Sequence, residues 1–395
     1  MGKVPKLRFK EFSDEWEEKK FKNFLIEKKE ITNEDLDLYS LTIENGIIPK
    51  NEKYEREFLV NNKDEAYKKM GKNDFAYNPM NIRFGAVAKF DENKFIKISK
   101  YYNIFYCNSK VNSYFFEKYI KIKRMIDFYN KISIGSLNEK KRLHYSEFIE
   151  IEQPFPSLQE QEKIANFLTN IDKKISLTEE KLELFREYKK GVMQKIFSQE
   201  LRFKDSNGND YPEWEEKKLG DILKEYIEKT TINNQYPILS STNKGIVLQN
   251  DYFNKQTAST NNIGYKIVPK DYFTYRSMSD TGEFTINIQQ ILEKGIVSPA
   301  YPVFNTDSEN KLFIYYSLNY NEFIKEQILT LKEGGTRYAL SYKKLEKLSI
   351  LLPILEEQQK IADFLSSIDS KIESIGKELE GLKEFKKGLL QQMFV

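Results

Sequence analysis

The most regular hydrophobic pattern in the chain is a heptad stripe that begins at Ile164. Its members recur at alternating steps of four and three residues, and Thr178 is the only polar one. The stripe comprises Ile164, Leu168, Ile171, Ile175, Thr178, Leu182 and Phe185. Because charged and other polar residues flank it, the pattern predicts a long helix whose narrow apolar seam packs against a partner helix.

A second stripe of the same kind occurs near the end of the chain. Its members are Ile361, Leu365, Ile368, Ile372, Ile375, Leu379 and Leu382. The surrounding sequence repeats as well, since PSLQEQEKIANFLTNIDKKI at 156–175 and PILEEQQKIADFLSSIDSKI at 353–372 share 13 of 20 residues. Two equal seams in one chain are expected to pack on each other.

The repeat also includes short motifs far upstream of each stripe. LRFK at 7–10 and WEEKK at 16–20 return as LRFK at 201–204 and WEEKK at 214–218. The chain therefore consists of two related halves with matching ends and diverged middles.

Each diverged middle has the pattern of a compact domain of mixed secondary structure. Short β-favouring segments such as FIKIS at 95–99 and YKIVP at 265–269 are separated by Asn, Gly and Asp turns. Each middle is then expected to contain one clear helix. In the second half it covers 311–329, and in the first half its apolar positions are Phe115, Tyr119, Ile122, Ile126 and Tyr129.

The expected fold is of the α+β or α/β class, with two globular domains related by the repeat and each followed by a long helix. The predicted boundaries are 1–150 for the first domain, 151–198 for its helix, 199–347 for the second domain and 348–395 for its helix. A twofold relation between the halves predicts an antiparallel coiled coil. A parallel pair would also bury both seams, and two unrelated surface helices are the remaining alternative.

Composition narrows the cellular setting and the kind of partner. No run of apolar residues is long enough to span a membrane, the N-terminus lacks the apolar run of a signal peptide, and Cys107 is the only cysteine. A cytoplasmic protein is therefore expected. The net charge of +3 is nearly balanced, so any affinity for nucleic acid must come from local basic patches.

The sequence lacks the common catalytic motifs. No GxxxxGK loop is present, and a single histidine, His144, excludes a site with two histidine ligands. YNPM at 77–80 resembles the Asn-Pro-Pro-aromatic motif of adenine methyltransferases, but its internal counterpart YRSM at 275–278 keeps only Tyr and Met. A packing role is therefore favoured, and the chain is expected to be a binding protein with no catalytic residue, metal site or cofactor.

Two variable domains, each followed by P(S/I)LxEQxKIAxFLxxIDxKI, resemble the specificity subunit of type I restriction-modification systems. The resemblance covers essentially the whole chain. It implies that each variable domain is a target-recognition domain for one half of a split, asymmetric DNA site. It also implies that the antiparallel coiled coil fixes the distance between the domains and docks the methyltransferase subunits.

The same resemblance implies the partners of the chain. They are double-stranded DNA, two modification subunits and, where restriction is included, two ATP-dependent restriction subunits, with no membrane. S-adenosylmethionine, ATP and Mg are then expected on the partner subunits.

Candidates for DNA contact are basic and amide residues in the polar segments of each middle, because such side chains bind phosphates and base edges. A solvated loop is the competing interpretation for each, and for Arg337 a glycine hinge. The candidates are Asn45, Lys50, Arg83, Lys244, Gln249, Asn261, Asn262, Arg276 and Arg337.

Two other functions remain open from the sequence. A coiled-coil scaffold without DNA binding would account for the helices but not for two diverged domains. A DNA methyltransferase or nuclease acting by itself would depend on residues such as Asn78, and its activity would be lost when Asn78 is replaced.

Overall fold

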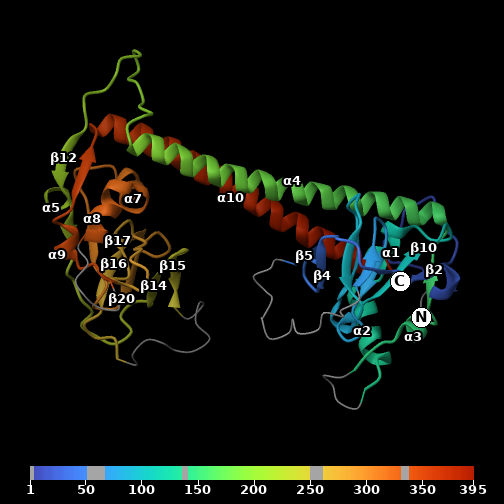
Figure 1. Ribbon diagram of the computed structural model, residues 1–395. Helices are drawn as coiled ribbons and strands as arrows, with labels where there is room; N and C mark the ends of the chain where they lie inside the picture. Colours follow the sequence, from blue (N-terminus) through green and yellow to red (C-terminus); the bar gives the residue numbers. More distant parts are fainter. Residues whose placement is uncertain (1–3, 51–66, 136–140, 250–260, 331–337) are drawn as a thin grey trace. The chain divides into compact units, whose positions relative to one another are not determined.

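The computed structural model describes residues 4–50, 67–135, 141–249, 261–330 and 338–395. The chain forms two compact units, of which unit 1 comprises Met1–Glu179 with Lys377–Val395, and unit 2 comprises Glu180–Gly376. Each unit contains one domain of strands and short helices together with a segment of both long helices (Figure 1). We refer to these as the first and the second domain.

The first domain contains two main sheets. One has the strand order β2-β10-β7-β8 and the other β3-β6-β9-β4-β5, while β1 pairs separately with β11. The strands are β1 Glu17–Lys20, β2 Leu25–Lys28, β3 Ile31–Thr32, β4 Leu38–Thr42, β5 Gly46–Pro49, β6 Tyr67–Met70, β7 Phe75–Tyr77, β8 Val87–Lys89, β9 Ile96–Ser99, β10 Asn103–Cys107 and β11 Glu152–Phe155. Its short helices are α1 Ser113–Tyr119, α2 Lys123–Ile132 and α3 Tyr145–Phe148, with 3₁₀ turns at Phe21–Asn23 and Ile82–Phe84.

The second domain repeats the four-stranded sheet with shorter strands, and its other strands form the two-stranded sheets β14-β15, β16-β20 and β18-β22. Its four-stranded sheet has the order β13-β21-β17-β19, and β12 pairs with β23 as β1 pairs with β11. The strands are β12 Glu215–Lys218, β13 Lys224–Glu225, β14 Leu239–Thr242, β15 Gly245–Leu248, β16 Lys266–Pro269, β17 Phe273–Thr274, β18 Met278–Ser279, β19 Asn287–Ile288, β20 Lys294–Val297, β21 Val303–Asn305, β22 Tyr338–Ala339 and β23 Ser349–Leu352. The short helices are α5 Leu219–Ile222, α7 Lys311–Tyr320, α8 Glu322–Thr330 and α9 Tyr342–Leu345.

The single helix expected in each middle is in fact two helices. In the second domain Asn321 ends α7 in an extended conformation, and its side-chain oxygen accepts a hydrogen bond from Phe323 N at the start of α8. In the first domain Ile122 is extended and separates α1 from α2. Apolar spacing persists across both breaks because the chain turns while its apolar side chains stay buried, so periodicity alone did not reveal them.

The repeat is visible in the cores of both domains. Phe75 and Phe105 stack with centroids 5.1 Å apart, and Phe273 and Phe304 stack at the same distance in the second domain. The tyrosines of the two YxxM segments also match, since Tyr77 donates to the carbonyl of Leu143 (3.3 Å) and Tyr275 donates to that of Leu340 (3.0 Å). The packing role expected for these tyrosines is therefore observed.

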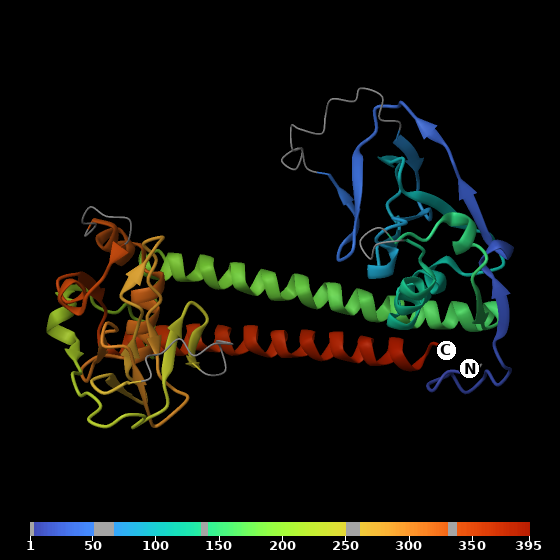
Figure 2. The same cartoon turned by 90° about the horizontal axis from the view of Figure 1, so that it is seen from below.

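The long helices α4, Leu158–Phe197, and α10, Leu355–Gln392, run side by side in opposite directions in each unit (Figures 1 and 2). In unit 1 Asp172 pairs with Lys386 at 2.5 Å and Glu179 pairs with Lys383 at 2.6 Å. In unit 2 Lys189 pairs with Asp369 at 2.5 Å. The expected pairing of the two helices is confirmed, and its direction within each unit is antiparallel.

Most predicted seam positions are buried between the helices and the domains. Phe185, Ile372 and Leu382 are half-buried, and every other member is at most 9% exposed. The polar member Thr178 is buried and donates its hydroxyl proton to the carbonyl of Lys174 (2.8 Å), which removes the cost of an unpaired hydroxyl. No helix in the described part of the chain is both long and apolar enough to cross a membrane.

The C-terminal end of each long helix packs on the domain of the other half. In unit 1 Phe394 contacts the rings of Phe115 and Tyr119, and in unit 2 Phe197 contacts Phe313. Each domain is thus supported by helix segments from both halves of the chain.

We predict that replacing Ile171 with Asp lowers the free energy of unfolding by about 3 kcal/mol, because an unpaired charge would enter the apolar seam. Ile171 is 9% exposed, whereas Leu177 on the same helix is 54% exposed and provides the matched control Leu177→Asp. Urea denaturation followed by circular dichroism measures both. Equal loss of stability in the two variants would show that position 171 does not lie in a packed seam.

Candidate nucleic-acid interface

A buried glutamate at the start of each long helix holds the arginine of the LRFK motif. In unit 1 Arg8 donates two hydrogen bonds to Glu160, at 2.8 and 2.7 Å. In unit 2 Arg202 donates to both oxygens of Glu357, at 3.2 and 2.8 Å. The two glutamates are 1% and 0% exposed, and their hydrogen bonds raise the pKa of both arginines. Such bidentate pairs fix geometry as well as neutralise buried charge.

The glutamine that follows each glutamate ties the long helix to its domain. Gln161 donates to the carbonyl of the proline before α4 (2.8 Å), and its oxygen accepts from Asn112 N (2.9 Å). Gln358 makes the same two bonds, with Asn310 N at 3.0 Å. Asn112 and Asn310 are the N-cap residues of α1 and α7. The EQ motif therefore holds the first turn of each long helix against a helix of the domain.

An aspartate further along each helix makes a second connection. Asp172 accepts from Lys118 of α1 (2.9 Å) and from Lys386 of α10 (2.5 Å). Burial by itself would raise the pKa of Asp172, but the two lysines outweigh this effect and the pKa lies below its ordinary value. In unit 2 Asp369 accepts from Tyr316 of α7 (2.7 Å) and from Lys189. We call these glutamate, glutamine and aspartate contacts the frame of each unit.

A β-hairpin projects from each domain at matching positions, β4–β5 in the first and β14–β15 in the second. In both, a threonine hydroxyl donates across the turn to a glycine carbonyl, Thr42 to Gly46 (3.1 Å) and Thr242 to Gly245 (2.8 Å). Both glycines have positive φ, +66° and +115°, which favours glycine at this place. The turns read TIENG and TNKG, so the exposed residues between the shared anchors differ in number and in charge.

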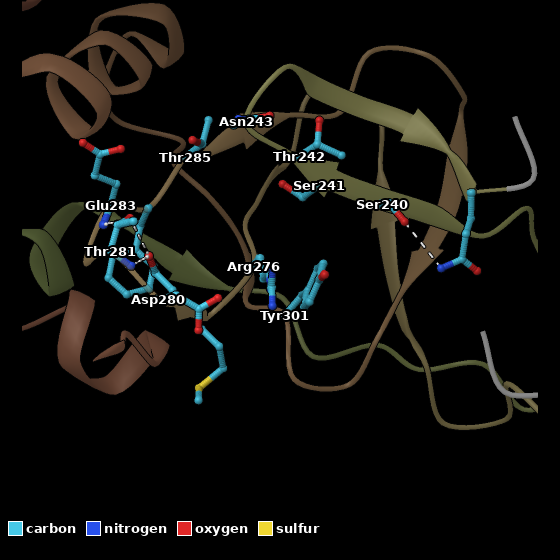
Figure 3. Close-up of a pocket in the computed structure, with 14 residues that line it drawn as sticks. Ser240, Ser241, Thr242, Asn243, Arg276, Asp280, Thr281, Glu283, Thr285 and Tyr301 are labelled. Carbon is cyan, nitrogen blue, oxygen red and sulfur yellow. Dashed lines mark hydrogen bonds between the residues drawn. The ribbon is translucent and has the colours of Figure 1, made fainter. Parts of the chain in front are cut away.

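The second hairpin forms one wall of a cavity of about 690 Å³ (Figure 3). Ser240, Asn243 and Gln249 line it from the hairpin side, and the segment 276–285 lines it from the other. Tyr301 completes the lining, and burial raises the pKa of this tyrosine although nearby Arg276 opposes the shift.

Hydrogen bonds within the domain hold both walls of this cavity. Asn287 on β19 donates to Ser241 Oγ (2.8 Å) and to the carbonyl of Thr242 (2.9 Å), which fixes the hairpin. On the other wall Ser279 Oγ accepts from Gly282 N (3.0 Å). Gly282 has φ +88°, and an added Cβ would lie 3.2 Å from the ring of Tyr338, so the turn requires glycine.

The candidate residues of the second domain fall into different environments. Arg276 and Gln249 line the cavity, and Lys244 is exposed at the hairpin turn. Asn261 is exposed, whereas Asn262 is fully buried. The side-chain oxygen of Asn262 accepts a hydrogen bond from Asn234 N, and its Nδ2 donates one to Asn234 Oδ1, both at 2.7 Å. This arrangement supports a structural role for Asn262.

The candidate residues of the first domain lie on or near its hairpin, with one exception. Asn45 and Lys50 are exposed, in the β4–β5 turn and directly after β5. Arg83 lies on a 3₁₀ turn, where its guanidinium covers the ring of Phe84 and reaches Asn130 Oδ1 (3.4 Å). Arg337 of the second domain lies outside the described residues.

Sequence reasoning missed several residues that shape these surfaces. Asn287 and Glu283 were not singled out, although Asn287 anchors the hairpin and Glu283 lines the cavity. The repeated LRFK and EQ motifs were recognised, but their mutual contact across about 150 residues was not. A search for an arginine and a glutamate that recur together in both copies would have suggested that pair.

We predict that Arg202→Ala lowers the free energy of unfolding by about 3 to 5 kcal/mol, because Glu357 would keep a buried charge without its partner. The matched control is Lys224→Ala, since Lys224 and Asp307 form an ion pair with side chains 75% and 65% exposed. Its loss should cost less than about 1 kcal/mol. Denaturant titration compares the two, and similar losses would contradict the proposed importance of the buried bridge.

The aspartate contact in unit 1 predicts a dependence of stability on pH. The folded-state pKa of Asp172 is lowered, so its contribution is fully present above the ordinary value of 3.8 and is lost as the pH falls through the lower folded value. Asp172→Asn should flatten the stability profile in that acidic range. Asp210→Asn, at an exposed carboxylate, is the control. If the melting temperatures of wild type and Asp172→Asn change with pH in the same way, the carboxylate of Asp172 makes no such contribution.

Comparison with known proteins agrees with the two-unit architecture. A family model described as "Type I restriction modification DNA specificity domain" matches residues 211–384. The type I restriction enzyme MjaVIII specificity subunit of Methanocaldococcus jannaschii is 27% identical over 266 residues, which are 62% of this chain and 61% of that protein. A candidate MjaX specificity subunit from the same organism is 27% identical over 296 residues, 71% of this chain and 67% of that protein.

Solved structures show the same fold over nearly the whole chain. The S subunit of a type I restriction-modification system from M. genitalium matches with a TM-score of 0.57 and 16% identity, and covers 99% of each chain. A chain from a structure concerned with complex assembly and conformational transition of the type I R-M system matches with a TM-score of 0.54 and 12% identity, and covers 96% of this chain and 97% of that one.

The repeated motifs, the paired helices and these comparisons agree with the expected role as a non-catalytic specificity subunit. Residues 211–384 match the type I restriction-modification DNA specificity domain, and the chain is similar to specificity subunits of these systems over most of its length.

Proposed function

We propose that this chain recognises DNA for a type I restriction-modification complex. Each domain reads one half of a bipartite, asymmetric site in double-stranded DNA, and the antiparallel helices set the number of base pairs left unread between the halves. Such a subunit acts in the cytoplasm, where it has access to the DNA.

The observation that carries this proposal is the contrast between an equal frame and unequal hairpins. The bonds of Glu160 and Gln161 in unit 1 recur at Glu357 and Gln358 in unit 2. The hairpin turns, by contrast, carry Glu44 and Asn45 in the first domain and Asn243 and Lys244 in the second. A protein that offers one partner two equal surfaces while reading two different base sequences needs this combination.

Exposed apolar side chains on the long helices support two copies of one partner. Tyr188 and Phe385 occupy the same position of the repeat and are 52% and 53% exposed, and Leu158 and Leu355 are 43% and 56% exposed. Aromatic side chains are enriched in protein interfaces, where binding buries them. We assign these positions to the docking of two modification subunits, with or without two restriction subunits.

The chemistry of such a complex then belongs to the partners. S-adenosylmethionine would bind to the modification subunits, and ATP and Mg to the restriction subunits. The role of this chain is to select the DNA sequence and to hold the modification subunits at a defined place on it.

The spacing role predicts the outcome of lengthening both helices by one heptad. Seven residues add about 10 Å of helix, which corresponds to about three base pairs of duplex. Sequencing of methylated adenines, in cells that carry this chain and its modification subunit, should show the same two half-sites separated by a longer spacer, or no methylation. A seam-preserving replacement of one heptad, which leaves the length unchanged, is the control.

Two outcomes of that experiment would contradict the proposal. An unchanged spacer in the lengthened variant would exclude the helices as the element that sets the distance. Absence of any split motif with the wild-type chain, in a complex shown to assemble, would favour a scaffold without DNA recognition.

A further inference from the structure

The cavity between the second hairpin and the segment 276–285 has an unusual set of charges for a DNA-facing surface. Its lining contains one cation, Arg276, and two carboxylates, Asp280 and Glu283. Hydroxyl and amide side chains supply most of the remainder, among them Ser240, Asn243 and Gln249. The formal charge of the lining is therefore −1, counted from these three residues.

A lining of this charge is poorly suited to a phosphate. Carboxylates repel phosphate oxygens, and phosphate contacts in protein–DNA complexes come mainly from lysine, arginine and neutral donors. Base edges differ because they present both acceptors and donors. An arginine fork fits O6 and N7 of guanine, and a carboxylate accepts from the N4 amino group of cytosine.

The geometry of the cavity favours recognition by fixed groups. Arg276 and Glu283 are exposed at the cavity and belong to the same chain segment, whose turn is held by the Ser279 hydroxyl and Gly282. Among the described residues, none forms a hydrogen bond or an ion pair with the guanidinium of Arg276, so its donors are available to a ligand. The opposite wall is fixed by the hydrogen bonds of Asn287.

We propose that this cavity reads a G·C base pair in one half of the DNA site, with Arg276 donating to guanine and Glu283 accepting from the paired cytosine. Lys244, exposed at the turn of the adjoining hairpin, contacts a phosphate and carries no sequence information. This inference rests on the proposed function and names the groups and the base pair by which the second domain performs it.

The first domain has a different residue at the corresponding place. Asn78 matches Arg276 in the repeat, because each follows the core tyrosine, Tyr77 or Tyr275. Its side-chain oxygen accepts from Met80 N at 2.9 Å and serves the local turn. The arginine-dependent preference is therefore restricted to the half-site that the second domain reads.

The test is selection of a random-sequence duplex DNA library by the purified chain in complex with its modification subunits, followed by sequencing. We expect a split motif for the wild type. Arg276→Lys keeps the charge but not the fork, and should reduce the preference for guanine at one position by about ten- to a hundredfold. Glu283→Gln should weaken the preference for the same base pair. The sequence selected at the other half-site should stay the same in both variants.

Two controls separate reading from general affinity. Lys244→Ala should weaken binding to all sequences alike and reduce its salt dependence, without changing the motif. Lys224→Ala, at an exposed ion pair outside the cavity lining, should change neither the binding affinity nor the motif. Arg276→Ala, checked for folding by thermal melting, should behave as Arg276→Lys does in base preference.

The outcomes distinguish this inference from the proposed function. A split wild-type motif that persists unchanged in Arg276→Lys and Glu283→Gln would overturn the cavity as a reading site and leave the proposed function intact. A uniform loss of affinity in these variants, as in Lys244→Ala, would also overturn it. Absence of any split motif for the wild type would overturn both.

Discussion

The bidentate bridge between the LRFK arginine and the buried glutamate is the interaction on which each unit depends. A carboxylate that is fully buried costs several kcal/mol unless it is neutralised and its oxygens are hydrogen-bonded. In unit 2 Glu357 accepts from Arg202 and also from Trp214 Nε1 (3.2 Å), so two repeated motifs, LRFK and WEEKK, meet at one carboxylate. The chain before the domain, the domain itself and the long helix are thereby fixed to one another.

This bridge explains why the ends of the two halves are alike while their middles differ. Arg8 and Glu160 form a matched pair, so that changing one of them leaves a buried charge, and the same holds for Arg202 and Glu357. Substitutions in the hairpin turns leave no buried charge, because the central residues are exposed. The shape of each turn is set by a threonine and a glycine. New turn residues can then alter recognition at little cost to folding.

The sequence predicted the long helices and the duplication because both depend on periodic patterns that need no knowledge of distant contacts. It did not predict the breaks at Asn321 and Ile122, where apolar spacing continues although the backbone turns. It also could not separate Asn261 from Asn262. The two residues have the same chemistry, yet one is exposed and the other is buried against Asn234, and only tertiary packing decides which polar side chain is satisfied internally.

The anchoring of the hairpins shows that the two domains have diverged below the exposed turns as well. The position opposite Ala76 on the neighbouring strand is Ala88 in the first domain, and the position opposite Thr274 is Asn287 in the second. An added Cβ on Gly46 would lie 3.2 Å from Ala88 Cβ, so the first hairpin packs closely on a small side chain. Asn287 instead holds the second hairpin by hydrogen bonds. Exchange of the turn residues alone would therefore move the turn without its support and leave Arg276 and Glu283 in place. A transfer of base preference between the domains requires residue 88 or 287 and the segment 276–285 to move with the hairpin.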